Sequence, residues 1–252
     1  MGNLLLERQR IEENYHDKKY GGKIIKHPNA REIDAYRFFK ELRRDVAGLK
    51  ILDFGSGNGW LSIDVSKEGA AEVYGIDISK ELIEKANQLA EAKGFSKTVH
   101  FIKMPGENLT FSDNCFDLCL GSAILHHTDL DLAVKNIYRV LKPGGRAIFI
   151  EPLNQNLFLK CWRKLTPWRR SPAEKALIND DLKFIRELFP NAKFHFFTFS
   201  SILTEGVMII FPNNRFVSSI NRLLERFDNK LLNLFPSLGK YCAIVVLEIN
   251  KD

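Results

Sequence analysis

The sequence predicts an α/β protein with a doubly wound, mostly parallel sheet that carries helices on both faces. Short β-branched or aromatic runs alternate with longer amphipathic runs between residues 49 and 152. The connections between these runs are only a few residues long, and a glycine-rich bend follows the first apolar run. Such an alternation indicates parallel strands with right-handed helical crossovers, and ligands then bind beyond the carboxyl ends of the strands.

The central elements follow one another at short intervals. Strands are expected at residues 50–55, 72–78, 98–104, 116–123 and 146–152, and helices at 59–69, 80–94 and 130–145. The helix at 80–94 has the most complete pattern, because Ser79 is placed to cap its start and Gly94 to end it. Its apolar residues form one stripe, which comprises Leu82, Ile83, Ala86, Leu89 and Ala90.

The rhythm changes on both sides of this core. Residues 1–48 are expected to form a helical N-terminal cap, and residues 153–240 to form insertions that cover the ligand side. The insertions contain predicted helices at 180–189 and 216–235 and a strand at 192–202, before a final strand at 241–249 within a closing segment 241–252. We therefore expect a single domain over residues 1–252, with its core at 49–152.

Composition excludes several classes of protein. The 252 residues are 45% hydrophobic and 27% charged, and no apolar run approaches the roughly 18 residues that a transmembrane helix needs. Arg8 and Arg10 come too early for a signal-peptide core, so we expect a cytoplasmic chain. The net charge is +6, and the part after residue 150 holds fifteen Lys and Arg against ten Asp and Glu. This excess either meets an acidic partner or forms a solvated basic face.

The glycine-rich bend reads "LDFGSGNGW", with Gly55, Gly57 and Gly59 at alternate positions. Glycine permits positive φ and leaves no Cβ between the backbone and a ligand, and the following helix presents free N–H groups. The spacing is G-x-G-x-G, which differs from the dinucleotide pattern G-x-G-x-x-G, and no Gly-Lys-Ser/Thr of a P-loop follows. Asp53 precedes the bend and is expected to orient it or to meet a positive ligand group through water.

An acidic residue ends the next predicted strand. Asp77 lies about twenty residues after the glycine bend, in "YGIDIS". A carboxylate at this point can accept hydrogen bonds from both ribose hydroxyls of a nucleoside. The alternative is that Asp77 only supports the start of the following helix. The pairing of Asp77 with the glycine bend at this distance favours the nucleoside site.

Four segments in order resemble the motifs of class I S-adenosylmethionine-dependent methyltransferases. They are "ILDFGSGNG", "VYGIDIS", "GENLTFSDNCFDLCLGSAILHH" and "AVKNIYRVLKPGGRAIFIEP". The resemblance covers about residues 45–152 and is closest to the branch of ubiquinone/menaquinone and similar small-molecule methyltransferases. It implies a seven-stranded Rossmann-like sheet with the last strand antiparallel, S-adenosyl-L-methionine as cofactor, and S-adenosyl-L-homocysteine as product.

The resemblance also implies a set of cofactor-binding residues. The glycine bend would pass the amino acid part of the cofactor, Asp77 would hold the ribose and Ile78 would pack on the adenine. In many relatives an Asp contacts the adenine amine where this chain has Pro105, so a backbone contact at Gly106 or Glu107 would replace it. The full set is Tyr15, Tyr20, Asp53, Gly55, Ser56, Gly57, Gly59, Asp77, Ile78, Gly106, Glu107, Gly121 and Ser122.

Two further groups of residues are expected near the reacting atoms. His126 and His127 follow the fourth strand and are candidates for a general base, although in similar enzymes this pair often has a structural role. Tyr15 and Tyr20 either fold over the cofactor as part of a lid or only pack the N-terminal cap. No metal-ligand spacing is present, so we expect no metal. Methyl transfer from a sulfonium is an in-line displacement that needs alignment and exclusion of water more than a nucleophile.

The acceptor is expected to be a small or lipid-like molecule. The segment 156–170 carries five basic residues and no acid, with Trp162 and Trp168 among apolar residues. Tryptophan beside Lys and Arg on an apolar face is typical of a membrane interface, so peripheral membrane contact competes with simple packing of a lid. Nucleic acid is not expected, because the basic residues follow no known module. An NAD-linked oxidoreductase and a non-catalytic cofactor-binding or membrane-associated protein are the alternative functions.

Overall fold

The computed structural model of the chain describes residues 2–20, 34–166, 171–204, 207 and 214–252. It contains a seven-stranded sheet in the order β3-β2-β1-β4-β5-β7-β6. The strands are β1 (Lys50–Phe54), β2 (Glu72–Asp77), β3 (Val99–Lys103), β4 (Phe116–Ser122), β5 (Leu141–Pro152), β6 (Lys193–Phe197) and β7 (Ile244–Asn250). Neighbours are parallel except that β7 runs antiparallel to β5 and β6. The predicted Rossmann-like sheet with its last strand antiparallel is confirmed.

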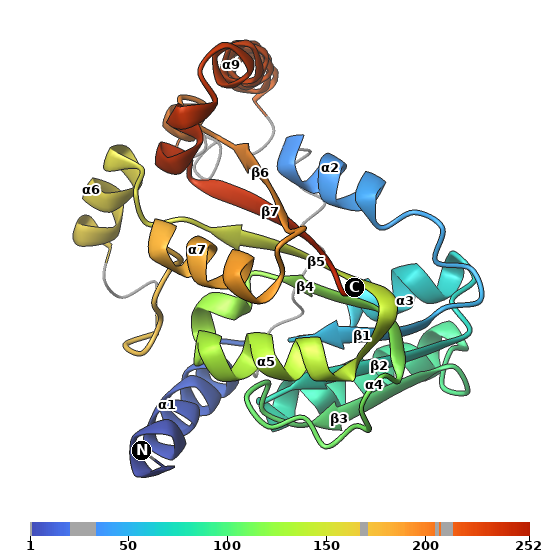
Figure 1. Ribbon diagram of the computed structural model, residues 1–252. Helices are drawn as coiled ribbons and strands as arrows, with labels where there is room; N and C mark the ends of the chain where they lie inside the picture. The colour runs from blue at the N-terminus through green and yellow to red at the C-terminus, as the bar shows by residue number, and fades with distance from the viewer. Residues whose placement is uncertain (1, 21–33, 167–170, 205–206, 208–213) are drawn as a thin grey trace.

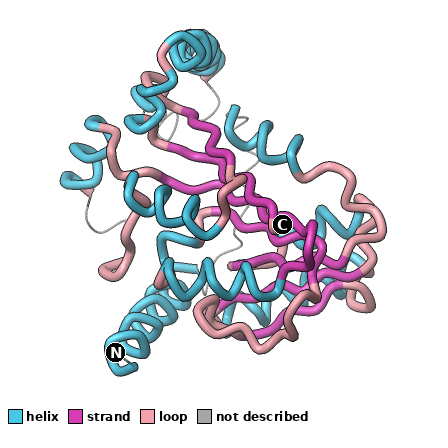
Figure 2. Tube along the Cα trace, viewed as in Figure 1, coloured by secondary structure: helices cyan, strands magenta, loops and turns pink. Residues whose placement is uncertain are grey.

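Helices cover both faces of this sheet (Figure 1, Figure 2). One face packs against α5 (Leu130–Val140) and α7 (Asn179–Leu188), and the other packs against α2 (Asp34–Leu42), α3 (Trp60–Lys67) and α4 (Lys80–Lys93). Side chains alternate between the two cores along each strand, as the two-residue period of a strand requires. In β5, for example, Phe149 enters one core, and Ile148 and Ile150 enter the other.

Local sequence explains the start and end of most elements. Ser79 caps α4 by accepting a hydrogen bond from the Leu82 backbone N–H at 3.1 Å, and Gly94 ends the helix in the left-handed region with φ 78°. Several boundaries differ from the expectation. The strand expected at 192–202 ends at Phe197, and the strand expected from residue 241 begins at Ile244. The predicted helix at 130–145 ends at Val140, and β5 begins at Leu141, since Pro143 lacks the N–H that a continued helix would use.

The remaining helices lie around the sheet's carboxyl edge and its β6 end. They are α1 (Gly2–Tyr20), α6 (Leu157–Leu165) and α9 (Arg215–Leu234), with short 3₁₀ helices η2 (Leu125–His127) and η4 (Pro236–Tyr241). Helix α1 packs against α4, while α9 lies at the opposite end of the molecule (Figure 1). No helix within the described ranges is both long enough and apolar enough to span a bilayer.

Candidate active site

The three glycines of the bend between β1 and α3 do not all serve the same structural purpose. Gly55, Gly57 and Gly59 all have positive φ, at 77°, 54° and 85°. A Cβ on Gly55 would lie 2.3 Å from the Ile124 side chain, and one on Gly59 would lie 2.5 Å from Phe101. A Cβ on Gly57 would meet no atom within 4 Å. Gly55 and Gly59 are therefore required for close packing as well as for their backbone angles, whereas Gly57 presents bare backbone to open space.

Asp77 joins the end of β2 to this bend. Its carboxylate accepts the Gly57 backbone N–H at 2.9 Å through Oδ2 and the Ser79 N–H at 2.9 Å through Oδ1. Burial raises the pKa of Asp77, while the hydrogen bonds from Ser79 and Gly57 oppose that rise. Asp77 thus fixes the bend relative to the start of α4, and it also borders the cavity described next.

A cavity of about 620 Å³ opens beyond the carboxyl ends of β1, β2 and β4. This is the edge at which doubly wound sheets bind their ligands. Helix α1 contributes Gln9, Glu12 and His16 to the wall, and α6 contributes Leu159 and Arg163. Ten residues predicted from the sequence line it, namely Tyr20, Gly55, Gly57, Asp77, Ile78, Gly106, Glu107, Ser122, His126 and His127.

Five other predicted residues, Tyr15, Asp53, Ser56, Gly59 and Gly121, do not line this cavity. Asp53 is buried behind the bend and accepts the Ser62 hydroxyl at 2.6 Å, and burial raises its pKa to about 7. A Cβ on Gly121 would lie 2.3 Å from the Phe149 ring, so a larger side chain there would displace the core. Tyr15 accepts a hydrogen bond from Lys19 on its own helix at 2.5 Å.

The first histidine of the pair is held by a buried carboxylate. His126 Nδ1 lies 2.7 Å from Glu151 Oε2, and both side chains are almost fully buried. Glu151, in β5, also accepts the backbone N–H groups of Ile124 and Leu125 through Oε1, at 2.8 Å each. Glu151 already accepts two backbone N–H groups and acts as an acceptor, so we assign a proton to Nδ1 of His126. Glu151 therefore fixes the turn after β4 and orients the His126 ring.

The second histidine contacts the N-terminal helix. His127 Nδ1 lies 3.0 Å from Glu12 Oε2, and Glu12 Oε1 accepts the Ser171 hydroxyl at 2.8 Å. Burial opposes ionisation of Glu12, yet hydrogen bonds from His127 and His16 bring its pKa down to about 2. Burial lowers the pKa of His127, an effect that its contact with Glu12 opposes. At neutral pH the pair is therefore a carboxylate beside a neutral imidazole.

These contacts bring potential metal ligands together from three segments. The ligand atoms of Glu12, His16 and His127 lie within 4.8 Å of one another, and so do those of His126, His127 and Glu174. Carboxylate and imidazole are ligands that divalent transition metals accept. Sequence analysis did not identify Glu12 or Glu174 as site residues, because they lie more than 45 residues from the histidine pair. The one local signal was the four-residue spacing of Glu12 and His16, which places both on one helix face.

Residues 52–149 match the protein family described as a methyltransferase domain. The chain is 38% identical over 99 residues to the sterol 24-C-methyltransferase of Aspergillus fumigatus, covering 39% of this chain and 26% of that protein. It is 32% identical over 161 residues to the demethylmenaquinone methyltransferase of Lactococcus lactis, covering 59% and 63%. The chain thus spans less than two thirds of the length of these curated relatives.

The fold comparison agrees with these sequence matches. The phosphoethanolamine N-methyltransferase 2 of Haemonchus contortus, solved in complex with S-adenosyl-L-methionine, superposes with a TM-score of 0.63 at 19% identity. The alignment covers 97% of this chain and 57% of that one.

Residues 52–149 therefore contain a methyltransferase domain, and the sheet order and glycine bend agree with the class I fold. The relatives that the chain matches include C-methyltransferases of ubiquinone/menaquinone biosynthesis and a demethylmenaquinone methyltransferase. The methyltransferase match over residues 52–149 does not favour the alternative of an NAD-linked oxidoreductase.

Proposed function

We propose that the protein transfers a methyl group from S-adenosyl-L-methionine to a small, lipid-like acceptor. The observation that carries this proposal is the position of the Asp77 carboxylate, which holds the Gly57 backbone and borders the large cavity. Each carboxylate oxygen of Asp77 accepts one backbone N–H and retains a lone pair for a ribose hydroxyl. The open backbone at Gly57 gives room for the close approach of the amino acid part of the cofactor.

Further lining residues support the same arrangement. Ile78 offers an apolar surface for the adenine, and Gly106 and Glu107 border the cavity after β3. Glu107 is held by Gln9, whose side-chain amide donates to it at 3.2 Å, and by the Asp129 backbone N–H at 3.0 Å. Ser122 at the end of β4 is assigned to the methionine part. Five residues that do not line the cavity, Tyr15, Asp53, Ser56, Gly59 and Gly121, support the bend, the cap or the core around it.

We assign to the two histidines the role of accepting the proton that the methyl acceptor loses. The bound cofactor supplies a methyl group that its positive sulfur activates for in-line transfer. The lowered pKa of His127 keeps that imidazole neutral, and therefore able to accept a proton, at pH 7. Glu151 and Glu12 act as positioning residues, because each holds the Nδ1 side of one histidine and both histidines line the cavity.

The acceptor class follows from helix α6 and from the relatives. Leu159 and Arg163 of α6 line the cavity, while Leu157, Phe158 and Leu165 are exposed to solvent. An apolar molecule could pass along this helix from a lipid surface into the cavity. The two curated relatives are named for a sterol and for demethylmenaquinone, which are apolar acceptors. We therefore also propose peripheral membrane contact at 156–166. A cytoplasmic location, expected from the sequence, is proposed as well. Trp168 and the Trp162 side chain lie outside the described residues.

Calorimetry with S-adenosyl-L-homocysteine tests the cofactor site. Asp77→Ala removes an ionised acceptor, and hydrogen bonds to charged groups contribute about 1.5–3 kcal/mol each, so we expect at least about 100-fold weaker binding. Asp77→Asn keeps one acceptor oxygen, so its affinity for S-adenosyl-L-homocysteine should lie between those of the wild type and Asp77→Ala. Asp131→Ala makes the same chemical change on the exposed face of α5 and should bind like the wild type. Unchanged affinity in Asp77→Ala, with a native circular dichroism spectrum, would contradict the proposed site.

A second measurement tests the histidines separately. Labelled donor is incubated with quinol and sterol extracts, and the methylated products are identified by mass spectrometry. His127→Ala should lower kcat by about 100-fold while the affinity for S-adenosyl-L-homocysteine stays within about threefold, since general base catalysis contributes about 10²–10⁴. A wild-type kcat in this variant would rule out the proton-accepting role of His127.

A further inference from the structure

Helix α9 (Arg215–Leu234) buries polar and charged side chains and exposes several large apolar ones. Its fully buried residues are Asn221, Glu225 and Asp228, all of them polar or charged. Four of its large apolar residues, Phe216, Leu223, Phe227 and Leu234, are between 54% and 73% exposed. A helix on a soluble domain normally buries its apolar stripe and exposes its polar one.

The polar face is anchored by specific hydrogen bonds. Asp228 accepts the backbone N–H groups of Phe199, Ser200 and Ser201 and the hydroxyls of both serines, at 2.6–3.0 Å. Asn221 accepts the Thr204 hydroxyl at 2.6 Å. These contacts come from one turn after β6, so they fix the rotation of α9 about its own axis. The apolar stripe is held outward by the fold.

A second anchor lies on the side of α2. Asn221 donates its side-chain amide to Glu225 at 3.0 Å, and Glu225 lies 3.9 Å from the Arg37 guanidinium of α2. Asn229 donates its amide to Asp34, also in α2, at 2.9 Å. The polar face of α9 is thus tied to two separate elements, and rotating the apolar stripe inward would break both sets of contacts.

The exposed apolar residues form one stripe along the helix. Their spacings of seven, four and seven residues place all four on the same side. The four cations of α9 are exposed as well, and they are Arg215, Arg222, Arg226 and Lys230. On a helical wheel they lie beside the apolar stripe, and both acidic residues of the helix lie on the buried side. The outer surface of α9 therefore combines apolar side chains with positive charge alone.

We propose that α9 docks in the headgroup layer of an anionic lipid bilayer, with its apolar stripe among the acyl chains and its four cations at the lipid phosphates. An apolar stripe flanked by Lys and Arg is the pattern of a helix that lies in a membrane surface. A second copy of this chain fits less well, because a twofold contact through α9 would bring its cations against their own equivalents. This docking does not depend on methyl transfer and goes beyond the proposed function.

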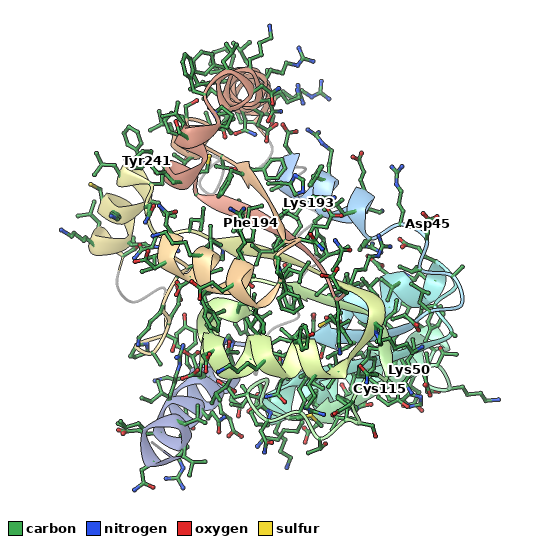
Figure 3. The ribbon with its side chains drawn as sticks, viewed as in Figure 1. Asp45, Lys50, Cys115, Lys193, Phe194 and Tyr241 are labelled. Atoms are coloured by element: carbon green, nitrogen blue, oxygen red, sulfur yellow. The ribbon has the colours of Figure 1, made fainter. Side chains whose placement is uncertain are left out.

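The elements next to α9 also expose aromatic side chains. Phe235 and Tyr241, at the two ends of η4, are exposed, and η4 packs against α9. Asn156, the N-cap of α6, donates to the carbonyl oxygens of Tyr241 at 3.0 Å and Phe199 at 3.1 Å. Helices α6 and α9 are thus connected through η4 and the turn that holds Asp228. In Figure 3, Tyr241 lies at this end of the molecule and Lys50 lies toward the far side of the sheet.

Flotation of the full chain with vesicles tests the proposal. We expect binding to vesicles of phosphatidylcholine with phosphatidylglycerol, and at least about tenfold less binding to phosphatidylcholine alone, since each cation near an anionic surface contributes to binding. Arg222→Gln/Arg226→Gln should reduce binding to the anionic vesicles about tenfold or more. Lys135→Gln/Lys183→Gln removes the same charge from exposed positions on α5 and α7 and should bind like the wild type.

The apolar stripe is tested by Leu223→Ser/Phe227→Ser, which should also reduce vesicle binding about tenfold or more. Retained affinity for S-adenosyl-L-homocysteine shows that Leu223→Ser/Phe227→Ser is folded. If that variant does not fold, the vesicle binding of Arg222→Gln/Arg226→Gln decides whether the proposal stands. The proposal is overturned if the wild type does not bind anionic vesicles, or if both double variants bind them as the wild type does. It is overturned as well if sedimentation shows a wild-type dimer that Leu223→Ser/Phe227→Ser converts to a monomer while vesicle binding is absent.

Discussion

Helices α5 and α9 are both amphipathic, yet they face the protein with opposite sides. Helix α5 buries Ala133, Val134, Ile137 and Val140 against the sheet and exposes its charged residues. Helix α9 buries Asn221, Glu225 and Asp228 and exposes four of its large apolar residues. The comparison shows that periodicity identifies two faces of a helix but not which of them is turned inward, because that depends on what the neighbouring elements offer.

The largest effect expected from this comparison concerns the anchor of α9. Asp228→Ala leaves three backbone N–H groups and two hydroxyls without their acceptor, and each buried unsatisfied group costs about 1–3 kcal/mol. Water will reach some of them, so we expect a loss of about 3–5 kcal/mol in the free energy of unfolding, measured by urea titration. Asp131→Ala on α5 is the exposed control. A loss below about 1 kcal/mol would mean that the polar face does not hold α9.

The corresponding test of α5 removes an apolar side chain from its buried face. Ile137 is 2% exposed and packs in the core on one side of the sheet. Ile137→Ala should lower the free energy of unfolding by about 2–4 kcal/mol, through lost burial and the cavity left behind. Urea unfolding followed by circular dichroism measures it. An unchanged midpoint and slope would contradict the assignment of this face as core.

Asp53 extends the comparison to a second buried carboxyl group, which accepts far fewer hydrogen bonds than Asp228 does. Burial raises its pKa to about 7, from the ordinary value of 3.8 for an aspartate. The unfolded chain therefore releases this proton near pH 4 and the folded chain only near pH 7, so the contribution of Asp53 to stability is complete below pH 4 and is lost as the pH rises to about 7.

Asp53→Asn removes this dependence, since an amide does not ionise. Its NH₂ group lacks a partner at a cost of about 1–3 kcal/mol, so we expect a net gain at pH 7 of about 1–2 kcal/mol and a net loss below pH 4. Free energies of unfolding at pH 4, 5.5 and 7 measure the crossover. A pH-independent difference between the two proteins would show that Asp53 ionises as freely in the folded state as in the unfolded one.

The smallest effect is expected at the exposed stripe of α9. Phe227→Ala removes a large apolar side chain that is already 54% exposed, so the free energy of unfolding should change by no more than about 0.5 kcal/mol. Differential scanning calorimetry in the absence of lipid provides the measurement. A loss as large as that of Ile137→Ala would place Phe227 in a packed environment and remove the contrast between the two helices.

The core and the position of Asp77 beside the glycine bend could be predicted because their signals are local. The strand, the glycine bend and Asp77 lie within 28 residues, and the sheet brings Asp77 to the Gly57 N–H. Glu12 and Glu174 could not be predicted, because their partners lie on distant segments. The same limit applies to Gly55 and Gly121, whose requirement for glycine comes from Ile124 and Phe149 in the folded core.

By itself, the sequence determined the alternation of strands and helices, the backbone bend with its acidic neighbour, and the amphipathic character of the outer helices. Only the tertiary structure decided which carboxylate meets which histidine and which face of α9 is buried. The physical reason is that a buried polar side chain is stable only where donors or acceptors meet it. For α9 those donors come from the turn at residues 199–201, more than 25 residues before Asp228.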